Sequence, residues 1–211
     1  MKIIIPARKG SKGVPLKNRK LFEYTANIIP EAMKHLTYVT TDDEHIKKQA
    51  IKYKFNVLNR TPEVSSDKAS SKDIMKYTID TLNILDETIL MLYLTYPLRK
   101  WKDVQTAMVC FDSLNLDSLL CKHPLDISPF LMLKEEKNNK GSQLFHHDLY
   151  RRQDYPECFE LSHYICLFKS NVINNLNNNL YNNNTYFLPI NKKVIDVDTL
   201  DDLNEFKKNK K

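Results

Sequence analysis

An α/β fold with a mostly parallel sheet is expected for this chain of 211 residues, because short apolar runs alternate with segments of helical spacing. Hydrophobic residues make up 42% and charged residues 27%, which is ordinary for a globular protein and excludes general disorder. Glycine occurs three times, and Gly10 and Gly13 share one loop. A chain so poor in glycine keeps it where backbone geometry or a close ligand requires it.

The first part of the chain sets this alternation. Residues 2–5 form an apolar, β-branched run that stops at a proline, which predicts a buried strand. A loop over residues 7–18 follows, and residues 36–41 predict a second strand. The acidic pair Asp42-Asp43 then offers an N-cap for a helix over about residues 44–53.

The middle of the chain continues in the same way. Apolar runs predict strands at residues 56–58, 88–94 and 118–121. Helical spacing predicts one helix capped by Ser70 or Ser71 and another over residues 102–111. Because ligands of parallel sheets bind at the carboxyl ends of the strands, we expect the loop over residues 7–18 at the ligand site.

Two later segments depart from this rhythm. Residues 128–145 carry apolar stretches on both sides of a polar segment and predict a hairpin-like arm outside the main sheet. Eight of the eleven residues over 174–184 are asparagine, which predicts a solvated loop without core residues. Residues 194–198 predict a last strand and residues 200–206 a last helix. We expect one domain over residues 1–211 with a protruding arm.

Composition also excludes several functional classes. No uncharged apolar run approaches the roughly 20 residues that cross a bilayer, and the N-terminal apolar run is too short for a signal peptide. We therefore expect a cytoplasmic protein without a membrane partner. The four cysteines form no CxxC pair, which favours free thiols. The net charge of +6 suits an anionic ligand, but no RNA-binding motif is recognised, so we expect no nucleic-acid partner.

The loop over residues 7–18 is the strongest candidate for chemistry. It combines two glycines and a serine with four cations, Arg8, Lys9, Lys12 and Lys17. Exposed backbone N–H groups and cations of this kind bind polyphosphates, although the Walker A spacing is absent. A basic surface turn is the alternative, and the concentration of scarce glycine favours the phosphate site.

Asp196 and Asp198 project to one face if residues 194–198 form a strand. Two such carboxylates favour a compensating cation, and Mg²⁺ held by carboxylates and substrate phosphates is the natural one. A plain surface pair explains these two residues equally well.

Two further segments allow either a binding role or a purely structural one. Residues 59–71 are rich in hydroxyls and open a helix, which suits polar recognition or ordinary capping. Arg151 and Arg152 suit a bidentate carboxylate or a solvated face. No nucleophile elbow or H-E-x-x-H pattern occurs, so the sequence gives little support to covalent or metal-hydrolytic catalysis.

Five ordered segments together resemble the CMP-sugar synthetases, the cytidylyltransferases of sialic and related nonulosonic acids. The family's I-P-A-R-x-x-S-K-G-x-P-x-K-N opening matches residues 5–18 at every fixed position. Its S-T-D-D segment resembles residues 40–43, and its R-P-x-x-x-x-S-D-x-A-S-S segment is similar to residues 60–71, with the same spacing from the arginine to the aspartate. Its R-R-Q-D-x-P-E and I-D-I-D-T segments are similar to residues 151–157 and 195–199.

The resemblance implies a Rossmann-like nucleotidyltransferase whose arm, residues 128–145, exchanges across a homodimer and reaches over the partner's active site. It implies that the anomeric hydroxyl of a 2-keto sugar acid attacks the α-phosphate of CTP, with Mg²⁺, to give a CMP-sugar and pyrophosphate. Such transfer needs positioning and charge neutralisation more than a protein nucleophile. This agrees with a chain that has cations and carboxylates but no catalytic triad.

Matching positions carry the family's roles onto this chain. Arg8, Lys17 and Asp198 are expected to be catalytic. The triphosphate is assigned to Arg8, Ser11, Lys12 and Lys17, and the cytidine to Asn18, Arg60, Ser70 and Ser71. Mg²⁺ is assigned to Asp196 and Asp198, and the sugar to Tyr93, Arg151 and Arg152.

Departures from the family pattern gather on the sugar side. The family's sugar-contacting glutamine is Tyr93 here, and the serine three residues later is Tyr96. The alternatives are therefore a 3-deoxy-manno-octulosonate cytidylyltransferase and a catalytically silent nucleotide-binding relative.

Overall fold

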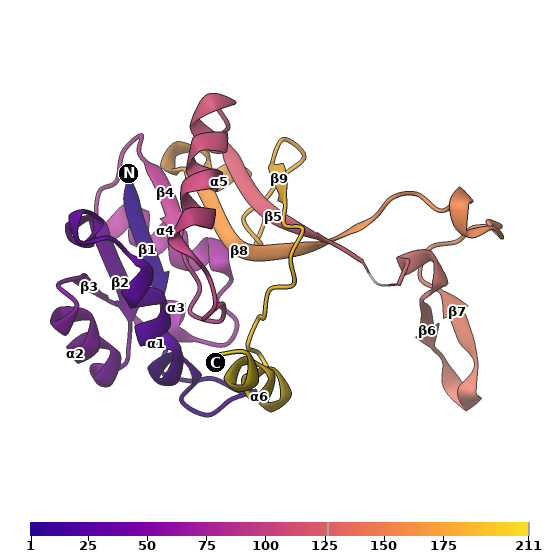
Figure 1. Cartoon of the computed structure of the whole chain (residues 1–211), viewed down its shortest axis with the longest axis horizontal. Helices are drawn as coiled ribbons and strands as arrows, with labels where there is room; N and C mark the ends of the chain where they lie inside the picture. The colour runs from indigo at the N-terminus through magenta and orange to yellow at the C-terminus, as the bar shows by residue number, and fades with distance from the viewer. Residues whose placement is uncertain (126, 211) are drawn as a thin grey trace.

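The computed structural model describes residues 1–125 and 127–210. A seven-stranded sheet of order β3-β2-β1-β4-β8-β5-β9 forms the body of the molecule (Figure 1). The strands are β1 (Lys2–Pro6), β2 (Thr37–Thr41), β3 (Asn56–Asn59), β4 (Thr88–Met91), β5 (Ser118–Pro124), β8 (Phe159–Lys169) and β9 (Tyr186–Pro189). Neighbours pair in parallel except at β8, which runs antiparallel to both β4 and β5. The prediction of an α/β fold with a mostly parallel sheet is confirmed.

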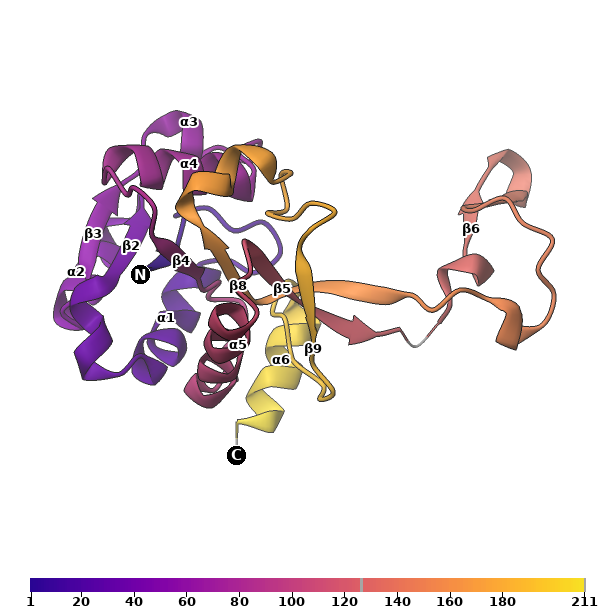
Figure 2. The ribbon, with the colours of Figure 1, turned by 90° about the horizontal axis from the view of Figure 1, so that it is seen from above.

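Helices cover both faces of this sheet (Figure 2). They are α1 (Lys17–Ile28), α2 (Glu44–Lys52), α3 (Pro62–Ser65), α4 (Ser71–Thr81), α5 (Trp101–Ser113) and α6 (Leu200–Asn209). The apolar faces of α1, α2, α5 and α6 share one core cluster, which includes Phe22 and Phe111. Met75 and Ile79 of α4 belong to a second cluster on the opposite face. In the described part of the chain, no helix is both long and apolar enough to span a membrane.

The predicted strand over residues 194–198 is wrong. Among the described residues this segment joins no ladder, and a backbone hydrogen bond from the Val197 N–H to the Thr95 carbonyl, at 2.8 Å, holds it beside the end of β4. Ile195 and Val197 are buried while Asp196 and Asp198 are exposed. The alternating burial of a strand is therefore present without the strand, and the two carboxylates still share one side.

The asparagine-rich segment does contribute to the core, contrary to prediction. Leu176 and Leu180 are buried in the cluster that α4 and β8 share, while most of the asparagines around them are exposed. The Lys72 ammonium of α4 donates to the carbonyl oxygens of Asn174 at 2.8 Å and Leu176 at 2.6 Å. A second lysine of α4, Lys76, donates to the Asn174 side chain at 3.0 Å, so two leucines and two lysines hold the segment to the body.

Residues 128–145, the arm, project away from the body between the ends of β5 and β8 (Figures 1 and 2). Within the arm, β6 (Leu133–Glu135) and β7 (Gly141–Gln143) pair antiparallel. A return segment, residues 146–158, leads back to β8, and Cys121 to Pro124 pair with the start of β8 to form a stalk. Leu133 and Phe145 are 65% and 51% exposed, so the arm presents apolar surface to solvent.

Candidate active site

The loop after β1 lies at the carboxyl edge of the parallel strands, where β2 fixes it. The Ala7 amide donates to the Thr40 carbonyl at 2.9 Å. The Lys9 amide donates to the Asp42 carboxylate at 2.7 Å. Asp43, the neighbour of Asp42, caps α2 instead by accepting from the His45 amide at 2.9 Å. Of the two acidic residues at the end of β2, Asp42 therefore holds the loop and Asp43 caps α2.

A cavity of about 300 Å³ opens at this edge, which is the lower end of the range for ligand pockets. We call it the β1–α1 cavity. Its lining combines the loop before α1 with the end of β4 and one residue near the C-terminus: Pro6, Arg8, Ser11, Lys12, Gly13, Lys17, Asn18, Arg60, Ile74, Tyr93, Leu94, Thr95 and Asp198. Seven of the residues assigned to CTP or catalysis by sequence thus meet in one hollow, and so does Tyr93.

Gly13 is required by a close backbone approach. A Cβ at this position would lie 2.0 Å from the Asp198 carbonyl oxygen, so any side chain would force the two segments apart. A Cβ added at Gly10 would meet no atom of the described residues within 4 Å, so no contact with them requires a glycine there. Of the two glycines in the loop, Gly13 is the one that lets the loop touch the segment that carries Asp196 and Asp198.

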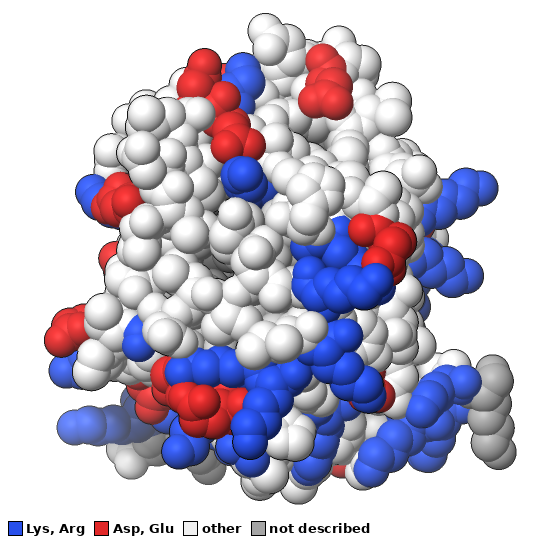
Figure 3. Space-filling view, turned by 90° about the vertical axis from the view of Figure 1, so that its left-hand side faces the viewer, with Lys and Arg blue, Asp and Glu red and all other residues white. Residues whose placement is uncertain are grey.

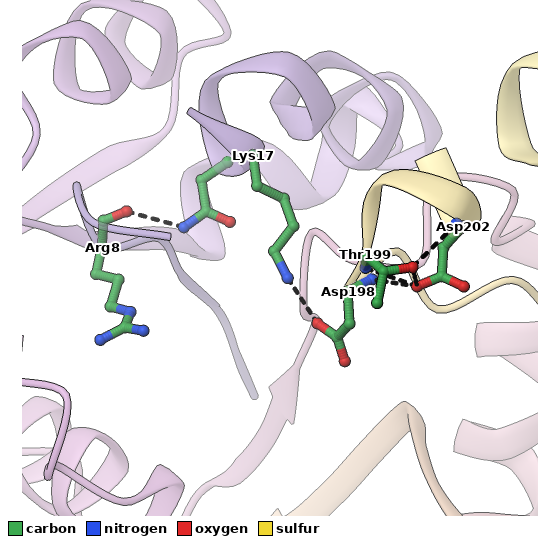
Figure 4. Close-up of polar contacts among 6 residues, drawn as sticks. Arg8, Lys17, Asp198, Thr199 and Asp202 are labelled. Carbon is green, nitrogen blue, oxygen red and sulfur yellow. Dashed lines mark hydrogen bonds and ion pairs between the residues drawn. The ribbon is translucent and has the colours of Figure 1, made fainter. Parts of the chain in front are cut away.

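The same contact is closed by an ion pair. The Lys17 ammonium, at the start of α1, lies 2.6 Å from the Asp198 carboxylate (Figure 4). Beside it, the Asp202 carboxylate accepts from the Asp198 amide at 3.0 Å and from the Thr199 amide at 2.7 Å. Asp202 therefore completes the capping box of α6, whose N-cap is Thr199, and fixes the backbone of Asp198, which leaves the Asp198 carboxylate to face Lys17 and the cavity.

Two cations of the loop share one acidic partner that the assigned site residues do not include. Asp67, between α3 and α4, pairs with the Arg8 guanidinium and with the Lys12 ammonium, the latter at 2.8 Å. Hydrogen bonds from Lys12 and Arg8 hold the pKa of Asp67 below its ordinary value. The signal was present in the sequence, because Asp67 is the acidic residue of the S-D-x-A-S-S match.

Arg60 reaches the cavity from the end of β3 as a buried guanidinium. Its Nε donates to the Thr40 hydroxyl at 3.2 Å, and its Nη2 has no hydrogen-bond partner among the described residues. Burial lowers the pKa of Arg60 to about 10. A buried N–H group without a partner is costly, so this group is suited to donate to a bound ligand.

The two serines assigned to cytidine differ in their contacts. Ser70 caps α4 and exchanges hydrogen bonds with Asp73, so its hydroxyl is already engaged. Ser71 bonds the hydroxyl of Tyr93. Burial raises the pKa of Tyr93 to about 12, so its phenol stays protonated at neutral pH. The His163 ring lies against Tyr93 with centroids 5.6 Å apart. Tyr93, which replaces the family's glutamine, therefore lines the cavity as an uncharged side chain held by two neighbours.

The carboxylates assigned to Mg²⁺ fit such a cation in chemistry and number. Partial desolvation raises the pKa of Asp196, and the nearby Asp198 charge raises it further, while hydrogen bonds from Thr95 and Tyr96 act against the rise. No cluster of three or more metal-ligating side chains occurs in the described ranges. Mg²⁺ needs only one or two carboxylates when substrate phosphates and water complete its shell.

Arg151 and Arg152 are not brought to this cavity. Neither is among the described residues that line the cavity, and both belong to the return segment, which lies outside the body in Figure 1. Arg151 is exposed and engaged with Asp154 through two hydrogen bonds of 2.8 and 3.0 Å. Within a single chain, the arginines assigned to the sugar therefore stand apart from the residues assigned to the nucleotide.

The charge of the surface fits an anionic ligand. Seen from the side of α2 and β3, Lys and Arg gather over the lower half of the molecule, with several carboxylates among them (Figure 3). In Figure 1 that half holds the loop before α1 and helix α6. This field favours the approach of polyanions.

Comparison with solved structures identifies the fold. The fold matches a CMP:2-keto-3-deoxy-manno-octonic acid synthetase complexed with CTP, with a TM-score of 0.69 and 15% identity, over 99% of this chain and 97% of that one. The fold is therefore that of the Rossmann-like nucleotidyltransferases, as the sequence implied.

Sequence comparison then gives the family. The family model described as cytidylyltransferase matches residues 2–109, and the chain belongs to that family. It is 30% identical to an N-acylneuraminate cytidylyltransferase of Streptococcus agalactiae, over 94% of this chain and 50% of the relative. It is 29% identical to post-translational flagellin modification protein B of Campylobacter coli, over 92% of this chain and 88% of that protein. The chain thus spans half the length of the streptococcal relative.

Proposed function

We propose that this chain is a cytidylyltransferase that couples CTP to a sialic-acid-like nonulosonic acid and releases a CMP-sugar and pyrophosphate. The observation that carries the proposal is the β1–α1 cavity, where Arg8, Lys17 and Asp198 converge from the two ends of the chain. The family of the chain and the printed names of its relatives support the same chemistry. The four cysteines are free thiols, which is consistent with a cytoplasmic enzyme.

Within this proposal the chain binds and orients CTP with its own side chains. Arg8, Ser11, Lys12 and Lys17 neutralise the triphosphate, which lowers the barrier to attack on the α-phosphate. The unpartnered Nη2 of Arg60 donates to the cytosine ring or the ribose. Asn18 holds the loop in place, because its amide donates to the Arg8 carbonyl at 2.9 Å.

Asp196 and Asp198 are the residues that would hold Mg²⁺. When bound, Mg²⁺ neutralises charge on the phosphates and lowers the pKa of the attacking hydroxyl. Lys17 supplies positive charge beside Asp198, and it is free to turn towards a phosphate oxygen when the carboxylate takes another partner. The chain itself therefore needs no strong base near the sugar.

We also propose that the enzyme acts as a homodimer. The exposed apolar surface of the arm is what a second copy of the chain would cover, and an exposed patch of this kind marks an interaction site. In such a dimer Arg151 and Arg152 of one copy reach the sugar acid at the cavity of the other copy.

Pyrophosphate release tests the activity directly. The chain is incubated with CTP and Mg²⁺ and with sialic, legionaminic, pseudaminic or octulosonic acid in turn. We expect release with one of the nonulosonic acids, and release with the octulosonic acid alone would replace the proposed substrate class. CTP binding without release for any sugar would favour the silent relative, in which Tyr93 and Tyr96 have closed the sugar side.

A further inference from the structure

Asp67 links the loop before α1 to a separate part of the chain. Its carboxylate accepts hydrogen bonds from Arg8 and from Lys12, which is the only pair of loop cations to share one acidic residue in the described part of the molecule. Asp67 itself lies in a turn closed by the Ala69 amide on the Ser66 carbonyl, and the Ser70 cap of α4 begins directly after it. The anchor of the two cations is thus fixed by local hydrogen bonds of its own.

These ion pairs are too exposed to be explained by stability. Asp67 is 48% exposed and Lys12 is 78% exposed. Pairs at such positions contribute little to folding, since water and salt screen them. Their effect on geometry is larger, because they restrict two long side chains that otherwise sample many rotamers.

The position of Asp67 distinguishes a residue that contacts the ligand from one that holds the cations in place from outside the cavity. Arg8 and Lys12 line the β1–α1 cavity, whereas Asp67 is not among its described lining residues. The carboxylate therefore holds the cations from outside and occupies one N–H of each group. Other donors of the guanidinium and the ammonium remain available to a ligand inside the cavity.

We propose that Asp67 is a positioning residue that preorganises Arg8 and Lys12 for the triphosphate of the nucleotide substrate. This inference rests on the proposed function and extends it, because Asp67 touches neither nucleotide nor sugar and acts through the two cations. When the side chains are held in place before binding, the entropic cost of immobilising them is removed from the binding step. A carboxylate that competed with phosphate would have the opposite effect on affinity.

The first experiment measures binding with Asp67→Ala and Asp67→Asn. We expect the Kd for CTP, and for inorganic pyrophosphate as a second probe, to rise about 10-fold in Asp67→Ala. Asp67→Asn keeps one acceptor oxygen and is expected to show a smaller rise. Asp80→Asn is the matched control, because it removes the same charge from an exposed position on α4, and its Kd should stay within about two-fold of the unmodified chain.

A second readout needs no ligand. Amide hydrogen exchange over residues 8–18 should be faster in Asp67→Ala than in the unmodified chain or Asp80→Asn, because the loop loses its anchor. A double-mutant cycle completes the test: Asp67→Ala should cost little further affinity when Arg8 and Lys12 are both alanine.

The outcomes separate this inference from the proposed function. Tighter binding in the Asp67 variants, or unchanged exchange of the loop, would overturn the positioning role. If the unmodified chain binds pyrophosphate but not CTP, the proposed function fails and the Asp67 comparison is decided with pyrophosphate. If it binds neither probe, both proposals fall.

Discussion

The body and the arm treat the same kinds of side chain in opposite ways. In the body, Ile4, Phe22 and Phe168 are fully buried, and cations from distant segments meet in one cavity. In the arm, Leu133 and Phe145 remain largely exposed. The body therefore completes a nucleotide cavity from one chain, whereas the arm presents surfaces that one chain does not satisfy.

The largest effect is expected when the Asp198 carboxylate is removed from the cavity of the body. Asp198→Ala should lower the rate of pyrophosphate release by at least about 10²-fold, because it removes a carboxylate proposed to hold Mg²⁺ at the phosphates. The circular dichroism spectrum should not change, because Asp198 is exposed. Asp201→Ala, at the exposed start of α6, is the control and should retain most activity. Unchanged turnover in Asp198→Ala would sink the Mg²⁺ assignment.

The arm is tested by its apolar surface. Leu133→Ser with Phe145→Ser should raise the dissociation constant of the proposed dimer at least about 10-fold, measured by sedimentation, since each side chain contributes about 1.5–3 kcal/mol when buried. The thermal unfolding of the body should not change. Leu85→Ser with Val109→Ser removes two exposed apolar residues from the body and should leave association intact. Equal weakening in both pairs would mean that the arm has no special role.

Gly13 tests whether the cavity of the body depends on the close contact between the loop and Asp198. Gly13→Ala should lower the free energy of unfolding by about 1–3 kcal/mol and weaken CTP binding, because the new methyl group meets the Asp198 carbonyl. Gly10→Ala is the matched control and should shift stability by no more than about 0.5–1 kcal/mol in either direction. Urea denaturation compares the two, and equal losses would contradict the contact.

The smallest expected effect is an acid sensitivity of the body at Asp43. Burial raises the pKa of Asp43, but hydrogen bonds from Arg19 at 2.7 Å and from the His45 amide outweigh burial and hold the pKa below its ordinary value. A lowered pKa stabilises the fold above about pH 4, and this stability is lost as pH falls through the lower folded-state value.

Asp43→Asn isolates that charge, because asparagine caps a helix about as well as aspartate does. The variant should lose about 1 kcal/mol at pH 7, and its stability should fall less steeply than that of the unmodified chain between about pH 5 and pH 3. Parallel pH profiles for the two chains would contradict this role of the charge.

Local patterns were sufficient for β1, β2, α2, α4, α5 and α6, because apolar spacing and caps are properties of neighbouring residues, but they did not predict α1 or α3. They could not place β8, whose insertion between β4 and β5 depends on the whole sheet. The motif matches brought Arg8 and Asp198 to one site, but the pairing of Arg8 with Asp67 joins residues 59 positions apart. The position of Arg151 follows from the direction of the arm, which no local pattern encodes.

The contact between Lys17 and Asp198 joins residues 181 positions apart. At synthesis rates of about 5–20 residues per second, roughly 10–40 s separate the appearance of the ammonium from that of its carboxylate. During that interval a nascent chain carries the whole cationic loop without Asp198. Chains interrupted between residues 18 and 195 retain the loop and lack both Asp196 and Asp198, so the proposed reaction requires synthesis to pass residue 198.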